Sequence, residues 1–359
     1  MLNFTVGPVM SAEDVIEVAN HSTPYFRTPE FSTLMKENEA LMLEFLHAPE
    51  NSRCVFLTSS GTGAMESLVM NVLNDRDKAL VVNGGSFGQR FVDLCALHRR
   101  SFTEIKLPFG SALKREQLTP FIGCGYTALL INMHETSSGV LYNMPMIADF
   151  CKQNGILLLV DAISAFLADP LDMEALGAAA VITGSQKALA VQPGIAVVAL
   201  APAALARVEE NPEVCMYLSL KEALVNGIRG QTPFTPAVTT LLQIHHRLTA
   251  IRNSGGAEAE RRRIASVAAA FRAGIRDLPL ECFSENPSNA VTALQPKKQN
   301  AKEIFQVLKD EYKIWICPNG GAWADSVFRV GHIGHITEAD NQHLLDALHD
   351  LKARGILSE

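Results

Sequence analysis

The sequence predicts an α/β protein in which a mostly parallel sheet is covered by helices and a small α+β unit follows. The first observation is that six short apolar runs alternate with helix-length segments between residues 54 and 200. The second is that most of these runs are apolar at every position, as expected for strands buried on both faces. Strands that alternate with helices in this way form a doubly wound sheet.

The apolar runs define the expected strands. These are CVFLT (54–58), ALVVN (79–83), TALLINM (127–133), ILLLVD (156–161), AAVIT (179–183) and IAVVAL (195–200). A helix is expected directly after Gly61, because Ala64, Leu68 and Val72 recur on one helical face.

The C-terminal third has a different rhythm. A long charged helix is expected at 257–275. Short strands are expected at 289–294, 313–317 and 327–331, and further helices at 300–311 and 338–353. A Ser-Gly-Gly break interrupts this region at 254–256. We expect three parts: an N-terminal arm (1–15) that contributes to the active site, a large domain (16–245) and a small α+β domain (246–359).

Composition excludes several classes of protein. The 359 residues, 48% of them hydrophobic, are enough for two folded domains. A net charge of −7 argues against a nucleic-acid-binding surface. Seven scattered cysteines without a CxxC pair argue against a disulfide framework or zinc site and favour the cytoplasm. The N-terminus does not have the pattern of a signal peptide, and the longest apolar runs have only strand length, so no membrane span is expected.

The segment Thr58-Ser59-Ser60-Gly61-Thr62-Gly63 follows a predicted strand and opens a predicted helix. Small residues let the backbone approach a phosphate, and the first N–H groups of a helix donate to it. The same pattern also fits an ordinary glycine turn with a helix cap. It is not a Walker loop, because the GK[ST] ending is missing.

Asp161 ends one predicted strand, and Lys187, 26 residues later, follows another. Open α/β sheets bind ligands at the carboxyl ends of their strands, and a carboxylate buried there needs a cationic partner. A lysine beside a desolvated pocket can lose its proton and attack a carbonyl carbon. Considered singly, Asp161 also fits a helix cap and Lys187 an exposed loop.

In this order, these segments resemble the class V aminotransferases of pyridoxal-5'-phosphate (PLP) fold type I. Further matching segments are 82–90 (VNGGSFGQR), 134–139 (HETSSG), 160–164 (VDAIS), 184–187 (GSQK) with 193–194 (PG), and 328–331 (FRVG). The match runs from Val6-Gly7-Pro8 to Gly334 and is closest to the alanine–glyoxylate and 2-aminoethylphosphonate–pyruvate branches. It departs from the family pattern at VGP, at Phe87, and where His134 directly precedes Glu135. The resemblance implies a mixed, mostly parallel sheet of the seven-stranded type and a PLP-binding large domain.

The resemblance also implies a role for each matched residue. Lys187 would hold PLP as a Schiff base and then move a proton as base and acid. Asp161 would keep the pyridine nitrogen protonated, and Phe87 would stack on the ring. Thr136 would donate to the ring oxygen. Ser60, Gly61 and Thr62 would cradle the phosphate with help from Gln186, and Ser185 would also belong to the cofactor site.

For the substrate, the resemblance assigns the α-carboxylate to Arg329, whose planar guanidinium matches it by two parallel hydrogen bonds. Gly7 and Arg27 would lie near the substrate, and Arg27 could meet a distal phosphonate or carboxylate. Thr235, in QTPFTP (231–236), resembles a segment that reaches the neighbouring subunit's phosphate, so a homodimer with shared active sites is expected. A surface salt bridge for Arg329 and a Pro-rich turn at 231–236 are the plain alternatives.

The expected reaction transfers an amino group from a small amine or amino acid to a 2-oxo acid such as pyruvate or glyoxylate. Alanine, serine and 2-aminoethylphosphonate-like donors stay open. An alternative is a PLP-dependent lyase of the cysteine desulfurase or kynureninase kind, for which Cys317 is the candidate cysteine, although it ends an apolar run. A third possibility, a non-enzymatic fold relative, is disfavoured by the presence of Lys187, Asp161 and Arg329. No metal is expected, since the spacing of His332 and His335 is not a convincing ligand pattern.

Overall fold

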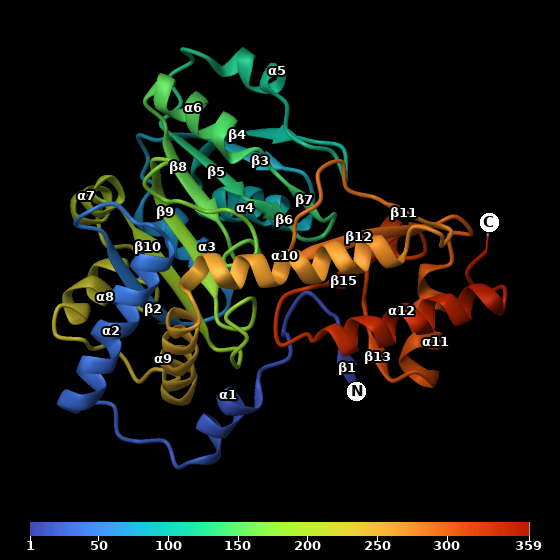
Figure 1. The fold of residues 1–359 in the computed structure, drawn as a ribbon. Coiled ribbons are helices and arrows are strands. Elements are labelled where there is room, and N and C mark those ends of the chain that lie inside the picture. The colour runs from blue at the N-terminus through green and yellow to red at the C-terminus, as the bar shows by residue number, and fades with distance from the viewer. Residues whose placement is uncertain (359) are drawn as a thin grey trace.

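The computed structural model describes residues 1–358, and its largest sheet has seven strands in the order β2-β10-β9-β8-β5-β3-β4. β10 is antiparallel to both of its neighbours, and the other pairs are parallel (Figure 1). The strands are β2 (Arg53–Thr58), β3 (Lys78–Asn83), β4 (Ser101–Lys106), β5 (Ala128–Asn132), β8 (Leu157–Asp161), β9 (Ala178–Gly184) and β10 (Ile195–Leu200). The six predicted strands are confirmed, with ends shifted by a residue at most.

The seventh strand, β4, was not predicted. Only Ile105 is buried in its sequence SFTEIK, because β4 forms the edge of the sheet next to β3. An edge strand exposes side chains that a central strand buries, so it lacks the continuous apolar run used to recognise the others.

Helices cover both faces of this sheet. On one face pack α3 (Gly61–Asn71), α4 (Ser86–Leu97), α7 (Pro202–Glu210) and α8 (Leu220–Gly227). On the other pack α2 (Pro29–Phe45), α6 (Met144–Asn154) and α9 (Val238–Asn253). β2 shows why both layers are needed, since Val55 and Leu57 face the first core while Cys54 and Phe56 face the second. The remaining helices of this part are short: α1 (Glu13–Glu17) and α5 (Arg115–Leu118).

The C-terminal part is a four-stranded antiparallel sheet with three helices. The sheet order is β11-β12-β15-β14, formed by β11 (Leu280–Cys282), β12 (Val291–Pro296), β15 (Phe328–Gly331) and β14 (Cys317–Pro318). The helices are α10 (Gly256–Gly274), α11 (Ala301–Glu311) and α12 (Glu338–Ala353). They share a core with the sheet, built around Phe271 and Phe328.

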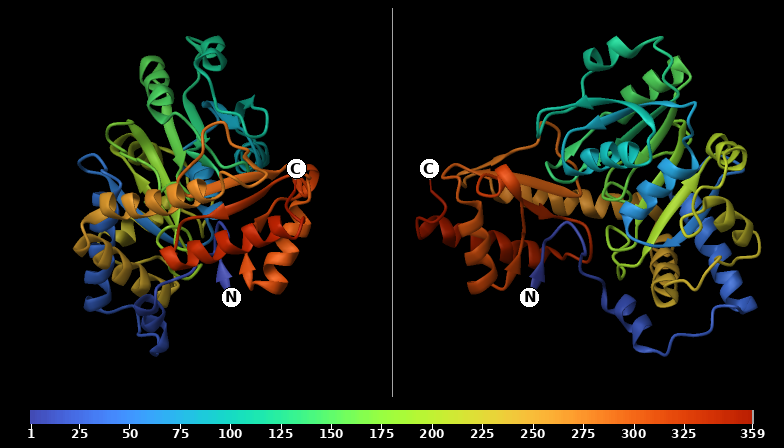
Figure 2. Two further views of the ribbon diagram at one scale, coloured as in Figure 1. Left: turned by 45° about the vertical axis from the view of Figure 1, so that its right-hand side comes forward. Right: turned by 180° about the vertical axis from the view of Figure 1, so that it is seen from behind.

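The first residues of the chain belong to this C-terminal core. β1 (Leu2–Asn3) pairs in parallel with β13 (Ile314–Trp315), and Phe4 is fully buried against the C-terminal helices. Figure 2 shows the blue N-terminal segment lying against the red C-terminal part before the chain turns towards the large sheet. The arm therefore passes between the two parts of the molecule.

The predicted domain boundary at 246 falls inside α9, which continues to Asn253. The predicted break at 254–256 is where α9 ends and α10 begins. The division of the chain into domains stays a prediction, and the end of α9 is the position at which we would now place it. Within residues 1–358, no helix combines the length and apolar character needed to cross a bilayer.

Candidate active site

The carboxyl ends of three neighbouring strands bring the main predicted residues together. β5 ends at Asn132, β8 ends at Asp161, and β9 ends at Gly184, just before Lys187. Because β5, β8 and β9 are parallel, these ends lie at the same edge of the sheet. Asp161 and Lys187 are close enough for each charge to affect the pKa of the other.

Asp161 is a buried carboxylate held in place by two hydrogen bonds. It accepts from Asn132 Nδ2 through Oδ2 and, at 2.8 Å, from the backbone N–H of Ile163 through Oδ1. Burial raises its pKa from 3.8 to about 6, although both hydrogen bonds and the charge of Lys187 act in the opposite direction. A cationic N–H donor beside Asp161 would therefore stabilise its charged form.

Lys187 is buried against the N-terminal arm. Its Nζ donates to the carbonyl oxygen of Val6 at 2.6 Å. Burial lowers its pKa from 10.5 to about 8, while the nearby Asp161 and Cys317 oppose this change. Gly7 has φ +119°, and a Cβ there would lie 2.7 Å from Lys187 Cδ. Only glycine fits that backbone and that approach, so the arm forms a wall of the lysine site.

The segment 58–63 forms the turn into α3, as predicted. Ser60 is exposed and its hydroxyl makes no cap hydrogen bond, while Gly61 is the first helical residue. A Cβ on Gly61 would lie 2.3 Å from Ile163 Cδ1, so glycine here lets the helix start pack on the loop after Asp161. Arg90 Nη1 donates to Thr62 Oγ1 at 2.9 Å. The turn thus joins backbone N–H groups with a cation, both suited to an anion.

The buried carboxylate of Glu135 accepts a hydrogen bond from the first turn of helix α4, and this holds the turn that carries Phe87. Glu135 Oε2 accepts from the backbone N–H of Gly88 at 2.9 Å, and its Oε1 accepts from the hydroxyl of Ser137 at 2.5 Å. A negative charge is favoured at a helix N-terminus. Phe87 is half-buried, and the Arg90 guanidinium lies 4.9 Å from its ring centroid.

A short hairpin at the end of β5 presents Thr136. The hairpin pairs β6 (His134–Glu135) with β7 (Val140–Leu141). Thr136 is buried, and its hydroxyl lies 2.7 Å from that of Ser164, which follows Asp161. Beside Lys187, the hydroxyl of Ser185 accepts from the backbone N–H of Ile195 at 3.3 Å. Gln186 is half-buried.

Arg329 reaches this hairpin from β15. Its Nη1 donates to the carbonyl oxygen of Thr136 and its Nη2 to that of Pro318, each at 3.1 Å. Its buried Nε has no partner within residues 1–358. Burial lowers the pKa of Arg329, against the effect of Cys317 and Glu135. Carbonyl oxygens orient a guanidinium without cancelling its charge, so Arg329 remains suited to an anionic ligand.

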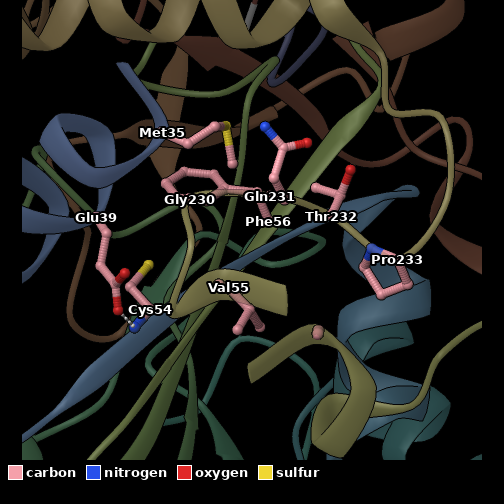
Figure 3. Close-up of a pocket in the computed structure, with 11 residues that line it drawn as sticks. Met35, Glu39, Cys54, Val55, Phe56, Gly230, Gln231, Thr232 and Pro233 are labelled. Atoms are coloured by element: carbon pink, nitrogen blue, oxygen red, sulfur yellow. Dashed lines mark hydrogen bonds between the residues drawn. The ribbon is translucent and has the colours of Figure 1, made fainter. Parts of the chain in front are cut away.

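Arg27 and Thr235 belong to a different cluster, at the segment 231–236. Arg27 donates to Gln231 Oε1 at 3.1 Å, to Thr232 O at 2.9 Å and to Pro233 O at 3.2 Å. These three acceptors line a pocket beside α2 and β2 (Figure 3). Thr235 is exposed. Within the described chain, no hydrogen bond joins either residue to Lys187 or Asp161.

Comparison with known sequences decides the family. The sequence profile of the family described as Aminotransferase class-V matches residues 14–330. The chain belongs to this family. It is 28% identical over 352 residues to an uncharacterized aminotransferase of Helicobacter pylori, covering 97% of this chain and 93% of that protein. It is also 28% identical over 315 residues to a 2-aminoethylphosphonate–pyruvate transaminase of Pseudomonas entomophila, covering 86% and 85%.

Solved structures agree. An aspartate aminotransferase of subgroup IV from Thermus thermophilus superposes with a TM-score of 0.90, at 25% identity and over 99% of both chains. The protein is thus a class V transaminase with the PLP-dependent α/β fold, and PLP is its cofactor.

The residues present fit PLP. Lys187 supplies an amine whose pKa is low enough to be partly neutral near pH 7, and Asp161 supplies a buried carboxylate at the same strand edge. The start of α3 and Arg90 offer donors for a phosphate. The unpartnered Nε of Arg329 is a buried polar atom that a ligand could satisfy.

Four residues near the site were given no role from sequence: Asn132, Arg90, Ser164 and His134. Asn132 could have been found, because a strand end aligned with that of β8 must place a side chain beside Asp161. Arg90, Ser164 and His134 all lie inside matched segments, but their contacts cross between segments. No local pattern shows such contacts.

Proposed function

We propose that this transaminase carries an amino group from a small amine or amino acid to a 2-oxo acid such as pyruvate or glyoxylate. The observation that carries the proposal is that Asp161 and the desolvated amine of Lys187 lie at one edge of the sheet, close enough for each charge to affect the pKa of the other. The similarity to a 2-aminoethylphosphonate–pyruvate transaminase supports pyruvate as an acceptor. Donors of the alanine, serine and 2-aminoethylphosphonate kind fit the same proposal.

PLP, when bound, supplies a carbonyl carbon for amines and a ring that accepts electrons from the substrate Cα. Lys187 would hold it as a Schiff base. Lys187 Nζ, when free, would accept the proton that the substrate Cα loses and deliver it to the former carbonyl carbon of PLP, and its lowered pKa of about 8 leaves part of the amine neutral for this role near neutral pH. Asp161 would keep a ring N–H in place, because an N–H donor relieves the burial of its carboxylate.

The other assigned residues would bind and orient. Ser60, Gly61, Thr62 and Gln186 would surround the phosphate, and Ser185 would belong to the cofactor site beside them. Phe87 would cover one ring face, and Thr136 would donate to the ring oxygen. Arg329 would bind the substrate carboxylate, with its guanidinium held by two carbonyl oxygens. Gly7 would border the substrate, because its backbone passes so close to Lys187 that an added Cβ would lie 2.7 Å from Lys187 Cδ.

We infer further that two copies form a homodimer with shared active sites. Thr235 is exposed, and Arg27 is bonded to the same segment. Large apolar side chains are exposed nearby: Tyr217, which stacks on Phe234 at 5.5 Å between ring centroids, is 53% exposed, and Tyr25 is 70% exposed. In a dimer, Thr235 would reach the neighbouring subunit's phosphate, and Arg27 would lie near the substrate, where it could meet a distal phosphonate or carboxylate. The scattered cysteines favour a cytoplasmic setting.

The test starts from the purified protein with PLP. Single amines are added while the visible spectrum is followed, and then pyruvate or glyoxylate is supplied. Transamination requires that one donor bleaches the yellow protein and that the oxo acid restores its colour. Release of sulfide, alanine or ammonia without this cycle would instead establish a lyase, with Cys317 the first residue to replace. A colourless protein that borohydride cannot label at Lys187 would refute the proposal.

A further inference from the structure

Three buried polar side chains, His134, Ser164 and Thr136, form a chain beside Lys187 and Arg329. Ser164 Oγ lies 2.8 Å from His134 Nδ1 and 2.7 Å from Thr136 Oγ1. Each of the three residues is at most 3% exposed. His134 Nε2 has no hydrogen-bond partner in the part of the chain that the structure describes. This hydrogen-bonded series therefore begins at the His134 imidazole, which has one bonded nitrogen, and ends at the Thr136 hydroxyl.

The position of the imidazole proton determines in which direction the hydrogen bonds of this series are donated. Burial, with the charges of Lys187, Arg329 and Arg272, lowers the pKa of His134 to about 3, so the ring is neutral and carries one N–H. A proton on Nε2 would be a buried donor without an acceptor. A proton on Nδ1 can instead be donated to Ser164, which leaves only the lone pair of Nε2 without a partner. In folded proteins, a buried donor without a partner is rarer than a buried acceptor without one. His134 therefore donates to Ser164.

The remaining protons follow in order. A serine hydroxyl has one proton, and since Ser164 Oγ accepts from His134, that proton goes to Thr136 Oγ1. Thr136 Oγ1 then accepts from Ser164, so its own proton points away from the chain. In the reverse direction, Thr136 would donate to Ser164 and offer only lone pairs, which repel an anionic oxygen.

We propose that His134 is a positioning residue that, through Ser164, holds the Thr136 hydroxyl as a hydrogen-bond donor to an anionic oxygen, the ring oxygen of bound PLP. The inference rests on the proposed function, because it takes Thr136 to face the cofactor. It assigns a role to a histidine at the position where the sequence departs from the family pattern. His134 itself exchanges no proton in this role, and it acts by fixing the direction of two hydroxyl groups.

The visible band of the lysine-bound cofactor reports on this donor. A hydrogen bond to the ring oxygen draws negative charge from it and so makes the neighbouring protonated Schiff-base nitrogen more acidic. We expect Ser164→Ala and His134→Leu to raise the pKa seen in a pH titration of the band by about one pH unit, roughly tenfold in the protonation equilibrium. His134→Asn, which keeps an N–H near the position of Nδ1, should restore the wild-type value.

Two comparisons separate this role from a loss of structure. Ser164→Ala combined with Thr136→Ala should shift the titration no further than Thr136→Ala alone, because Ser164 acts through Thr136. His332→Leu is the matched control. His332 is fully buried, with Nδ1 unpartnered and Nε2 2.7 Å from the Thr292 hydroxyl, and has no link to Thr136 within residues 1–358. Its replacement should leave the titration unchanged.

The outcomes are distinguishable. A wild-type protein that forms no visible band with PLP overturns the proposed function, and this inference with it. A wild-type band with unchanged titration in Ser164→Ala and His134→Leu overturns the positioning role alone. So does an equal shift in His332→Leu, since the effect would then come from losing any buried imidazole.

Discussion

The low pKa of Lys187 predicts that this lysine reacts with carbonyl compounds near neutral pH. With a pKa of about 8 instead of 10.5, about 9% of Lys187 amines are neutral at pH 7, against about 0.03% for an ordinary lysine. Only the neutral amine attacks a carbonyl carbon. At equal access, Lys187 in the cofactor-free protein should therefore react roughly 300-fold faster than an ordinary lysine at pH 7.

Labelling with a small aldehyde and borohydride between pH 6 and 11 would measure this, with mass spectrometry resolving each lysine. The rate at Lys187 should rise about tenfold per pH unit up to about pH 8 and then level off. Exposed Lys36 provides the internal reference. A rate at Lys187 that keeps rising tenfold per pH unit through pH 10 would show that this amine has the pKa of an ordinary lysine.

Replacing Asp161 tests how the surroundings of Lys187 set its pKa. Its charge raises the pKa of Lys187, so Asp161→Asn should move the plateau to lower pH. Asp169→Asn is the matched control, because Asp169 is a buried carboxylate bonded to Ser288 and Asn289 on the C-terminal part. A plateau that moves equally in both variants would show that the effect is not specific to Asp161.

Three further predictions concern stability and cofactor capture. Gly7→Ala combines a strained φ with a clash at Lys187, so we expect a loss of about 1–3 kcal/mol in urea unfolding and slower PLP binding in stopped-flow; unchanged kinetics would contradict the close approach. The pKa of Asp161 is about 6 in the folded protein, against 3.8 for an aspartate free of these surroundings, so the native state binds more protons in that window and loses stability as pH rises through it. Without the cofactor, the free energy of unfolding of Asp161→Asn should therefore exceed that of wild type by about 3 kcal/mol above pH 6, and the two should be equal below about pH 4. A difference in unfolding free energy that does not change with pH would rule this out. Glu135→Gln removes the carboxylate at the start of α4 and should lower the free energy of unfolding in urea by about 1–3 kcal/mol. An unchanged free energy of unfolding would mean that the carboxylate does not hold the helix.

Six strands of the central sheet and the positions of Asp161 and Lys187 could be predicted from the amino-acid sequence. Strands buried on both faces are apolar at every position, so the runs of β5, β8, β9 and β10 are visible without knowledge of their partners. Parallel strands place their carboxyl ends on one edge of the sheet, which is why Asp161, at the end of one run, and Lys187, after another, lie on the same edge. The polar edge strand β4 gave no such signal, because its place depends on backbone pairing with β3.

Tertiary structure alone decided which groups touch. Val6 meets Lys187 although 181 positions separate them, because β1 pairs with β13 and draws the arm past the lysine. Arg27 faces Thr232 and Pro233, an arrangement that its charge and loop position did not specify. Burial and periodicity are properties of a local segment, whereas a hydrogen bond between distant residues depends on how whole layers pack. The positions of Asp161 and Lys187 at the strand ends could therefore be predicted from the sequence, whereas their hydrogen-bond partners were fixed only by the fold.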